Sequence, residues 1–158
     1  MMLNASIVLY HPDWIGEVIP LVEELLRVTY MHTLYLVDNS ETRADPAVLP
    51  QSDKVRYIFL GENVGYGRGH NTALRESIYD GIKYHLVLNS DIELKAEDID
   101  TLCAFMETQP MVGQLMPRVV YPNGEIQYLC KLLPTPLDVF GRRFLPKCRT
   151  AKRNARYE

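Results

Sequence analysis

The chain has 158 residues, 47% of them hydrophobic, which predicts one compact domain with its own core. No basic stretch followed by an apolar one opens the sequence, and no apolar run approaches the roughly 20 residues that span a bilayer, so neither a signal peptide nor a membrane helix is expected. The formal net charge is −3, with −9 on residues 1–141, and an acidic body of this kind is atypical of nucleic-acid-binding proteins.

The first part of the chain predicts a strand, a helix and a second strand. Ser6–Tyr10 is short, apolar and partly β-branched, which favours a buried strand. Apolar residues then recur on one stripe from Ile15 to Leu26, as in an amphipathic helix. Pro20 predicts that the regular part of this helix starts near Ile19 or is kinked. Leu34–Val37 is the second expected strand.

The middle of the chain repeats the alternation. A polar loop over residues 41–53 precedes a third expected strand, Val55–Leu60. A glycine-rich loop, Gly61–Gly69, leads into a second expected helix over Asn71–Ile82, and Tyr84–Leu88 is the fourth expected strand. Uniformly apolar strands that alternate with helices are typical of a parallel sheet covered on both faces.

A third helix and a hairpin are expected next. The stretch KAEDIDTLCAFMETQP is acidic at its start and has a proline at its end, as helices often do. Val112–Met116 and Val119–Tyr121 are expected strands, and a Pro-Asn-Gly turn joins the latter to Glu125–Leu129 in a hairpin. The predicted fold class is therefore α/β: a doubly wound, mainly parallel sheet with helices on both faces and a C-terminal hairpin or helix.

Polar residues follow three of the expected strands. They are Tyr10-His11-Pro12-Asp13, Asp38-Asn39-Ser40 and Asn89-Ser90-Asp91. Each group alone is ordinary turn chemistry, but the carboxyl ends of strands in a doubly wound sheet share one edge, where ligands bind. Because Mg²⁺ or Mn²⁺ often binds through one or two carboxylates and the phosphates of a nucleotide, Asp91 is a candidate metal ligand beside a neutral Asn89. The competing interpretation is that Asp91 caps the following turn.

The segment GENVGYGRGHN is rich in glycine and precedes a helix. Glycines let the backbone approach a ligand closely, and the start of a helix offers free N–H groups to an anion. The segment is neither a P-loop, since no G-K-[ST] follows, nor a dinucleotide fingerprint, since its glycines have the wrong spacing. Arg68 adds a fixed positive charge suited to a phosphate or a base edge. A flexible surface loop is the alternative.

The order of these features resembles the N-terminal half of a family 2 glycosyltransferase with the GT-A fold. It is most similar to the rhamnosyltransferase-like branch that builds bacterial surface polysaccharides. The resemblance covers about residues 4–145 and is carried by five segments in register, SIVLYHPD, LYLVDNS, ENVGYGRGHN, LVLNSDI and LMPRVVYPNGEIQ. It implies that residues 1–141 form a nucleotide-sugar-binding GT-A domain, partial in extent, with residues 142–158 as a basic tail or a truncated continuation.

The resemblance also implies roles for individual residues. Tyr10 and His11 would line the nucleobase pocket, and Asp38 would accept a hydrogen bond from the imide N–H of uracil or thymine. The residues expected around the base and ribose come from the glycine-rich segment and the helix after it: Asn63, Gly65, Arg68 and Asn71. Asn89 and Asp91 would stand at the DxD-like metal motif, with the first acid replaced by Asn.

The implied reaction is an inverting transfer from dTDP-rhamnose or a UDP-hexose to a surface-polysaccharide or lipid-linked acceptor. A divalent metal would offset the charge on the leaving diphosphate, and a carboxylate would take the proton of the acceptor. In the family this base lies downstream, in the half that holds the acceptor site, so we expect this chain to lack it and to have little activity alone. The expected location is cytoplasmic or at the inner face of the membrane.

The end of the sequence is strongly basic. Residues 142–158 carry 7 basic residues and one acid, so they could contact anionic lipid or an acidic partner, although a solvated tail is the simpler interpretation. The segment LLPTPLDVFGRRFLP could form a dimer contact or an ordinary helix.

A non-catalytic, flavodoxin-like nucleotide- or phosphate-binding module is the alternative function. A receiver-like signalling domain is disfavoured, since no adjacent acids follow the first strand.

Overall fold

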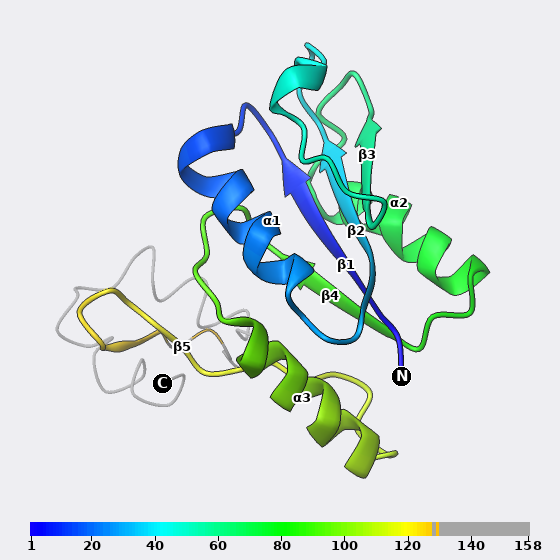
Figure 1. Ribbon diagram of the computed structural model, residues 1–158, viewed down its shortest axis with the longest axis vertical. Coiled ribbons are helices and arrows are strands. Elements are labelled where there is room, and N and C mark those ends of the chain that lie inside the picture. Colours follow the sequence, from blue (N-terminus) through cyan, green and yellow to red (C-terminus); the bar gives the residue numbers. More distant parts are fainter. Residues whose placement is uncertain (128, 130–158) are drawn as a thin grey trace, which may run out of the picture. The chain divides into compact units, whose positions relative to one another are not determined.

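The computed structural model describes residues 1–127 and residue 129 (Figure 1). The chain divides into two compact units, Met1–Gly113 and Gln114–Glu158, which are considered separately. The predicted boundary between residues 141 and 142, the basic tail and the segment over residues 132–146 all lie outside the described residues. Within the described part of the chain, no helix is both long and apolar enough to cross a membrane.

Four strands of the first unit form one parallel sheet, as predicted. They are β1 (Leu3–Leu9), β2 (Met31–Asp38), β3 (Val55–Phe59) and β4 (Tyr84–Leu88), in the order β3-β2-β1-β4. All neighbouring pairs are parallel. The register sets Leu9 opposite Asp38, and Asp38 opposite Phe59, so the carboxyl ends of the first three strands are level. Because the chain first moves outward from β1 and then returns to β4, the strand order reverses between β1 and β4.

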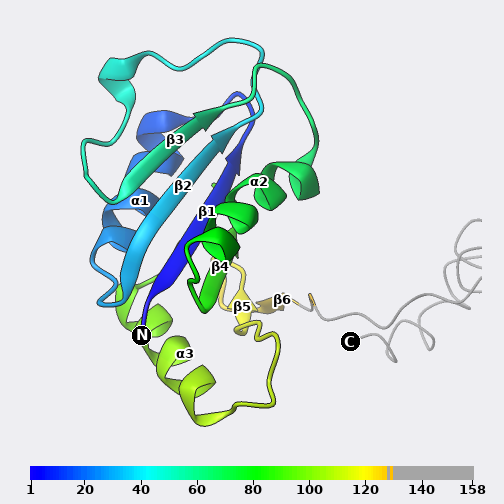
Figure 2. The ribbon, with the colours of Figure 1, turned by 90° about the vertical axis from the view of Figure 1, so that its right-hand side faces the viewer.

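Helices cover both faces of this sheet, which makes it doubly wound. The helices α1 (Ile19–Leu26) and α3 (Ala96–Thr108) lie on one face, and α2 (Tyr66–Tyr79) lies on the other (Figures 1 and 2). Successive side chains of β1 point to opposite faces of the sheet. Its odd positions, such as Ile7 and Leu9, belong to a large apolar core with α1 and α3. The side beneath α2 has a much smaller apolar cluster, around Tyr35, Val37 and Ala73.

The start of the first helix agrees with the proline signal. A π-helical turn, η1 (Trp14–Val18), precedes α1, and Pro20 stands in the first turn of α1. Asp13 caps η1, since its Oδ1 accepts a hydrogen bond from the Gly16 amide at 2.8 Å. The α-helix therefore begins at Ile19, where the missing N–H of a proline in the first turn costs no intrahelical bond.

Acidic side chains of α1 and α3 each accept hydrogen bonds from the segment of the other helix. Glu24 of α1 accepts a hydrogen bond from the Ala96 amide at 2.9 Å, at the first residue of α3. Asp100 of α3 accepts from the amide and the hydroxyl of Thr29, just after α1, at 3.0 and 2.7 Å. The bond to the Ala96 amide satisfies a backbone N–H at the start of α3 that has no partner inside the helix. It also anchors the segment between β4 and α3.

The second helix starts five residues earlier than predicted. It begins at Tyr66 instead of Asn71, so Gly67 and Gly69 lie inside the helix. A Cβ at Gly69 would lie 2.8 Å from Val8 Cγ2, closer than real Cβ contacts. Gly69 is therefore needed for α2 to approach β1, and the loop predicted through residue 69 is wrong because helix packing, rather than chain flexibility, explains this glycine.

The remaining expectations are met in part. A 3₁₀ turn, η2 (Pro46–Val48), lies within the predicted polar loop. The hairpin is confirmed, since β5 (Val119–Val120) pairs antiparallel with β6 (Ile126–Gln127). The strand predicted at Val112–Met116 is wrong: these residues are irregular, and its apolar side chains have no partner strand in the described part of the chain. The C-terminal helix lies outside the described residues.

Candidate functional site

The carboxyl edge of the sheet brings together the polar residues that follow β1 and β2, as the sequence predicts. The amide of Asn39 donates to the Leu9 carbonyl at 2.8 Å, continuing the pairing of the two strands by one residue. The amide of His11 then donates to Ser40 Oγ at 2.9 Å. The chain after β1 is thus fixed to the chain after β2 by backbone and side-chain bonds.

Asp38 is the most buried acid of this edge, with 1% of its surface exposed. Its Oδ1 accepts a hydrogen bond from the Ser40 amide at 2.9 Å, and its Oδ2 accepts one from the Tyr57 hydroxyl of β3. Burial and the bond to Asp38 raise the pKa of Tyr57 to about 12, so its hydroxyl stays a donor at neutral pH. Asp38 shapes the turn after β2, and its predicted contact with a base stays a prediction.

Tyr10 and His11 lie at the tip of β1 and are held by a residue that the sequence analysis missed. The Tyr10 hydroxyl donates to Glu41 Oε1 at 3.3 Å, and His11 Nε2 lies 3.0 Å from Glu41 Oε2. His11 has a φ of 48°, in the left-handed region that costs a non-glycine residue roughly 1–2 kcal/mol. Such strain is typical of functional sites. The strand-end pattern could not reveal Glu41, because it stands in the polar loop after Ser40.

The predicted residues of the glycine-rich segment lie at the start of α2. Asn63 Oδ1 accepts a hydrogen bond from the Gly65 amide at 3.0 Å, and Gly65 has a φ of +84°. A Cβ on Gly65 would meet no other atom within 4 Å, so its conformation, and not close packing, requires glycine. Arg68 and Asn71 are exposed on α2. In the part of the chain that the structure describes, no salt bridge involves Arg68.

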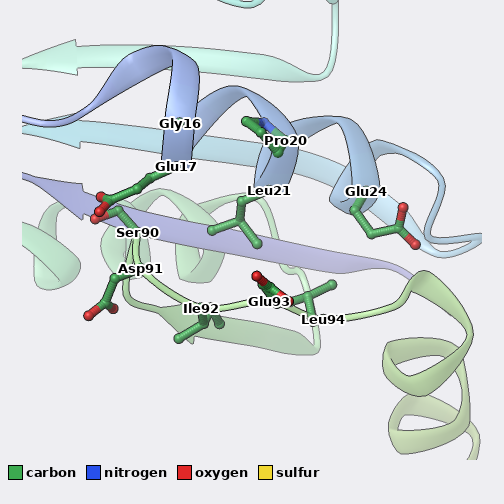
Figure 3. A pocket seen from close by; sticks show the side chains of 10 residues that line it. All are labelled: Gly16, Glu17, Pro20, Leu21, Glu24, Ser90, Asp91, Ile92, Glu93 and Leu94. Carbon is green, nitrogen blue, oxygen red and sulfur yellow. The ribbon is translucent and has the colours of Figure 1, made fainter. Parts of the chain in front are cut away.

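A cleft of about 390 Å³ lies between the first helical turns and the segment after β4 (Figure 3). Leu21, Ile92 and Leu94 give it apolar walls. Glu17, Glu24, Asp91 and Glu93 also line it. Figure 3 shows the Glu17 side chain reaching from the helix toward Ser90. The cleft has four carboxylates and no basic side chain among its lining residues, so an anion would enter it only with a cation.

Asn89 and Asp91 follow β4 at this cleft, and both are exposed. Asp91 caps no helix of the described chain: Lys95 stands at the N-cap of α3, and Glu24 binds the first amide of that helix. The described residues also hold no group of three or more metal-binding side chains. The donor set therefore suits a cation that Asp91 shares with a ligand, and it does not suit a cation held by protein alone.

These observations define a mixed α/β domain whose parallel sheet carries a polar edge at the point where its strand order reverses. A family model for glycosyl transferase family 2 matches residues 17–143. The chain belongs to this family, and its sheet and helices agree with the Rossmann-like GT-A fold. It is thus a glycosyltransferase domain, which uses a nucleotide-sugar donor and an acceptor. No match to a curated protein was found.

Proposed function

We propose that this chain binds a UDP- or dTDP-linked sugar along the carboxyl edge of its sheet, with the nucleoside over β1 and β2 and the diphosphate at Asp91. The observation that supports this proposal is that one edge of the sheet has a hydrogen-bonded polar group after β1 and β2 and an exposed carboxylate after β4. Tyr10, His11 and Asp38 lie at the β1–β2 end, where the chain is fixed by hydrogen bonds. Asp91 is exposed at the β4 end beside a cleft.

The proposed cofactor is Mg²⁺ or Mn²⁺, held by Asp91 and the phosphates of the donor, with Asn89 as a neutral neighbour. Four acidic side chains line the cleft, and a diphosphate would be repelled there without a cation. When bound, the cation would stabilise negative charge on the leaving diphosphate as a Lewis acid. Replacing the first acid of the motif by Asn89 leaves one carboxylate, which predicts weak binding of the metal without nucleotide.

The proposed reaction is an inverting transfer in which an acceptor hydroxyl attacks the anomeric carbon of the sugar and the nucleoside diphosphate leaves. We place the enzyme in the rhamnosyltransferase-like branch, with dTDP-rhamnose or a UDP-hexose as donor and a polysaccharide or lipid-linked glycan as acceptor. The ordered segments from SIVLYHPD to LVLNSDI support this branch. The residues described here supply donor binding, and none of them is assigned as the base.

Calorimetric titration with UDP and dTDP, with and without Mn²⁺, tests the proposal. We expect Asp91→Ala to lower Mn²⁺-dependent binding at least roughly tenfold, because the cation loses its protein ligand. Asp53→Ala is the matched control, since Asp53 is also exposed but precedes β3, at the opposite edge of the sheet. Equal binding by wild type and the Asp91 variant would contradict the proposed metal site.

The flavodoxin-like binding module, the alternative expected from the sequence, does not agree with the match to glycosyl transferase family 2, and the same titration separates the two. That alternative predicts binding of nucleotides without any dependence on Mn²⁺, or binding of flavin. Failure of the folded wild-type chain to bind UDP or dTDP would contradict the proposed donor site as a whole.

A further inference from the structure

A series of hydrogen bonds runs under α2 on the face of the sheet opposite α1. The Asn4 side chain donates to Ser77 Oγ at 2.8 Å, and Ser77 Oγ lies 2.7 Å from His85 Nδ1. Ser6 Oγ lies 2.7 Å from His85 Nε2 and 2.7 Å from His70 Nδ1. The series therefore ends at the ring of His70. Among the described residues, the other ring nitrogen, His70 Nε2, is buried and has no hydrogen-bond partner.

The series determines which groups could bind His70 Nε2. Ser6 Oγ has one proton and lies between two ring nitrogens, so it donates to one histidine and accepts from the other. For a neutral His70, Nε2 is an acceptor in one direction of the series and a donor in the other. Burial lowers the pKa of His70 to about 4, which agrees with a neutral ring. A hydroxyl group can donate or accept, so it matches both cases.

A second unpaired atom lies under the same turn of α2. Asn39 is 2% exposed, and its Nδ2 donates to the Gly65 carbonyl at 3.3 Å, which fixes the orientation of the amide. Its Oδ1 has no partner within the described chain and lies 3.4 Å from the position that a Cβ of Gly69 would take. A buried polar group without a hydrogen-bond partner destabilises a fold. Two of them under one turn call for an explanation.

The side chain of Tyr66, in the first turn of α2, packs against His70. The Tyr66 ring packs edge-on against the His70 ring, with 4.3 Å between centroids. His70 is 3% exposed, whereas Tyr66 is 51% exposed, so the buried His70 ring packs against a side chain that is half exposed to solvent.

The two unpaired atoms lie between the two ends of the proposed donor site. Asn39 directly follows Asp38, at the end proposed for the base, and His70 Nδ1 lies 2.7 Å from Ser6 of β1, the strand between β2 and β4 in the sheet. In a nucleoside diphosphate, the ribose connects the base to the diphosphate. Its hydroxyl groups are thus the polar groups that would arrive above His70 and Asn39.

We propose that His70 Nε2 and Asn39 Oδ1 form a ribose-binding subsite, covered by Tyr66 in the free protein, that takes a hydroxyl group of the donor nucleotide. This subsite rests on the proposed function, because it requires a nucleotide along the carboxyl edge. It selects ligands by the 2′- and 3′-hydroxyls. A thymidine nucleotide lacks the 2′-hydroxyl, so the subsite also bears on the choice between UDP and dTDP.

The test combines ligand and protein changes. Binding of UDP, 2′-deoxy-UDP and 3′-deoxy-UDP is measured with wild type, His70→Phe and His32→Phe. We expect wild type to bind at least one deoxy analogue about tenfold more weakly than UDP. His70→Phe should bind UDP about tenfold more weakly and lose this discrimination. His32→Phe is the matched control, because His32 is exposed and lies outside the series; it should keep the wild-type ratio.

A second measurement uses wild-type protein alone, so its result does not depend on whether a variant folds. In wild-type protein labelled with ¹⁵N-histidine, we expect the His70 Nε2 resonance to shift on addition of UDP and to shift less with the deoxy analogue that binds weakly. Equal affinities of wild type for all three nucleotides, or an unmoved His70 resonance in the UDP complex, would overturn the subsite alone. No binding of UDP by folded wild type would overturn the proposed function together with it.

Discussion

The two ends of the carboxyl edge are built in different ways. At the β1–β2 end, both carboxylate oxygens of Asp38 accept hydrogen bonds within the protein, one from the Ser40 amide and one from the Tyr57 hydroxyl. At the β4 end, Asn89 and Asp91 are exposed, and their side chains make no hydrogen bond to other described residues. The end proposed for the nucleoside is therefore organised before a ligand arrives, whereas the end proposed for the diphosphate has a carboxylate that is free of hydrogen bonds to other described residues.

Removing Asp38 should break the organised end with the largest loss of stability. In Asp38→Ala, the Ser40 amide and the Tyr57 hydroxyl both lose a buried acceptor, so we expect unfolding to become easier by about 3 kcal/mol. Tyr57→Phe removes one of these bonds and should cost about 1 kcal/mol. Urea unfolding of both variants and of the double variant measures the coupling. Additive losses would contradict a direct bond between the two side chains.

Acid should weaken the buried face of the sheet under α2 next. Burial lowers the pKa of His70 and of His85 to about 4, from 6.5 in the unfolded chain. The unfolded state then binds more protons between about pH 6.5 and pH 4, so stability is full above 6.5 and falls as the pH falls. Each histidine should contribute a loss of about 2 kcal/mol by pH 5.

Chemical unfolding of wild type and His70→Gln between pH 7.5 and pH 5 measures this loss. The variant should show a shallower dependence on pH by up to one proton. His32→Gln is the control, because His32 is exposed and should leave the dependence unchanged. A wild-type stability that does not change between pH 7 and pH 5 would rule out neutral buried histidines.

A smaller loss of stability is expected at the start of α3, where a hydrogen bond to Glu24 anchors the segment that contains Asp91. Glu24→Ala removes the acceptor of the Ala96 amide at the start of α3, and loss of such a cap costs about 1 kcal/mol. Arg27→Ala removes only the exposed ion pair with Glu24, which is expected to cost close to nothing. Thermal unfolding of the two variants distinguishes the cap from the ion pair. Similar losses in both would mean that the Glu24 cap has no role of its own.

The sequence predicts much of this fold because strands and helices have local signatures. Apolar runs located all four strands of the sheet, and Pro20 indicated where α1 begins. The start of α2 could not be read locally, since Gly69 looks like a loop residue and is explained only by its contact with Val8. The apolar run at Val112–Met116 resembles a strand, but a strand also needs a partner, which no local pattern supplies.

The candidate site was predictable to a similar extent. Polar residues after the strands predicted that Tyr10, His11, Asp38 and Asp91 lie at one edge, because parallel strands bring their carboxyl ends together; their roles in binding stay predictions. The partners of these residues were not identified. Tyr57 lies 19 positions from Asp38, and Ser6 lies 64 positions from His70. Such pairs depend on how the elements pack, so only the folded chain reveals that Tyr57 fixes Asp38 and that His70 ends a buried series.

The most direct test of a donor site with two different ends is a calorimetric comparison of uridine with UDP, each with and without Mn²⁺. Both ligands share the nucleoside, and only UDP has the diphosphate that would bring a cation to Asp91. We predict that Mn²⁺ leaves the affinity for uridine unchanged and raises the affinity for UDP at least roughly tenfold. Equal affinities for UDP with and without Mn²⁺, or an equal gain for uridine, would contradict this account.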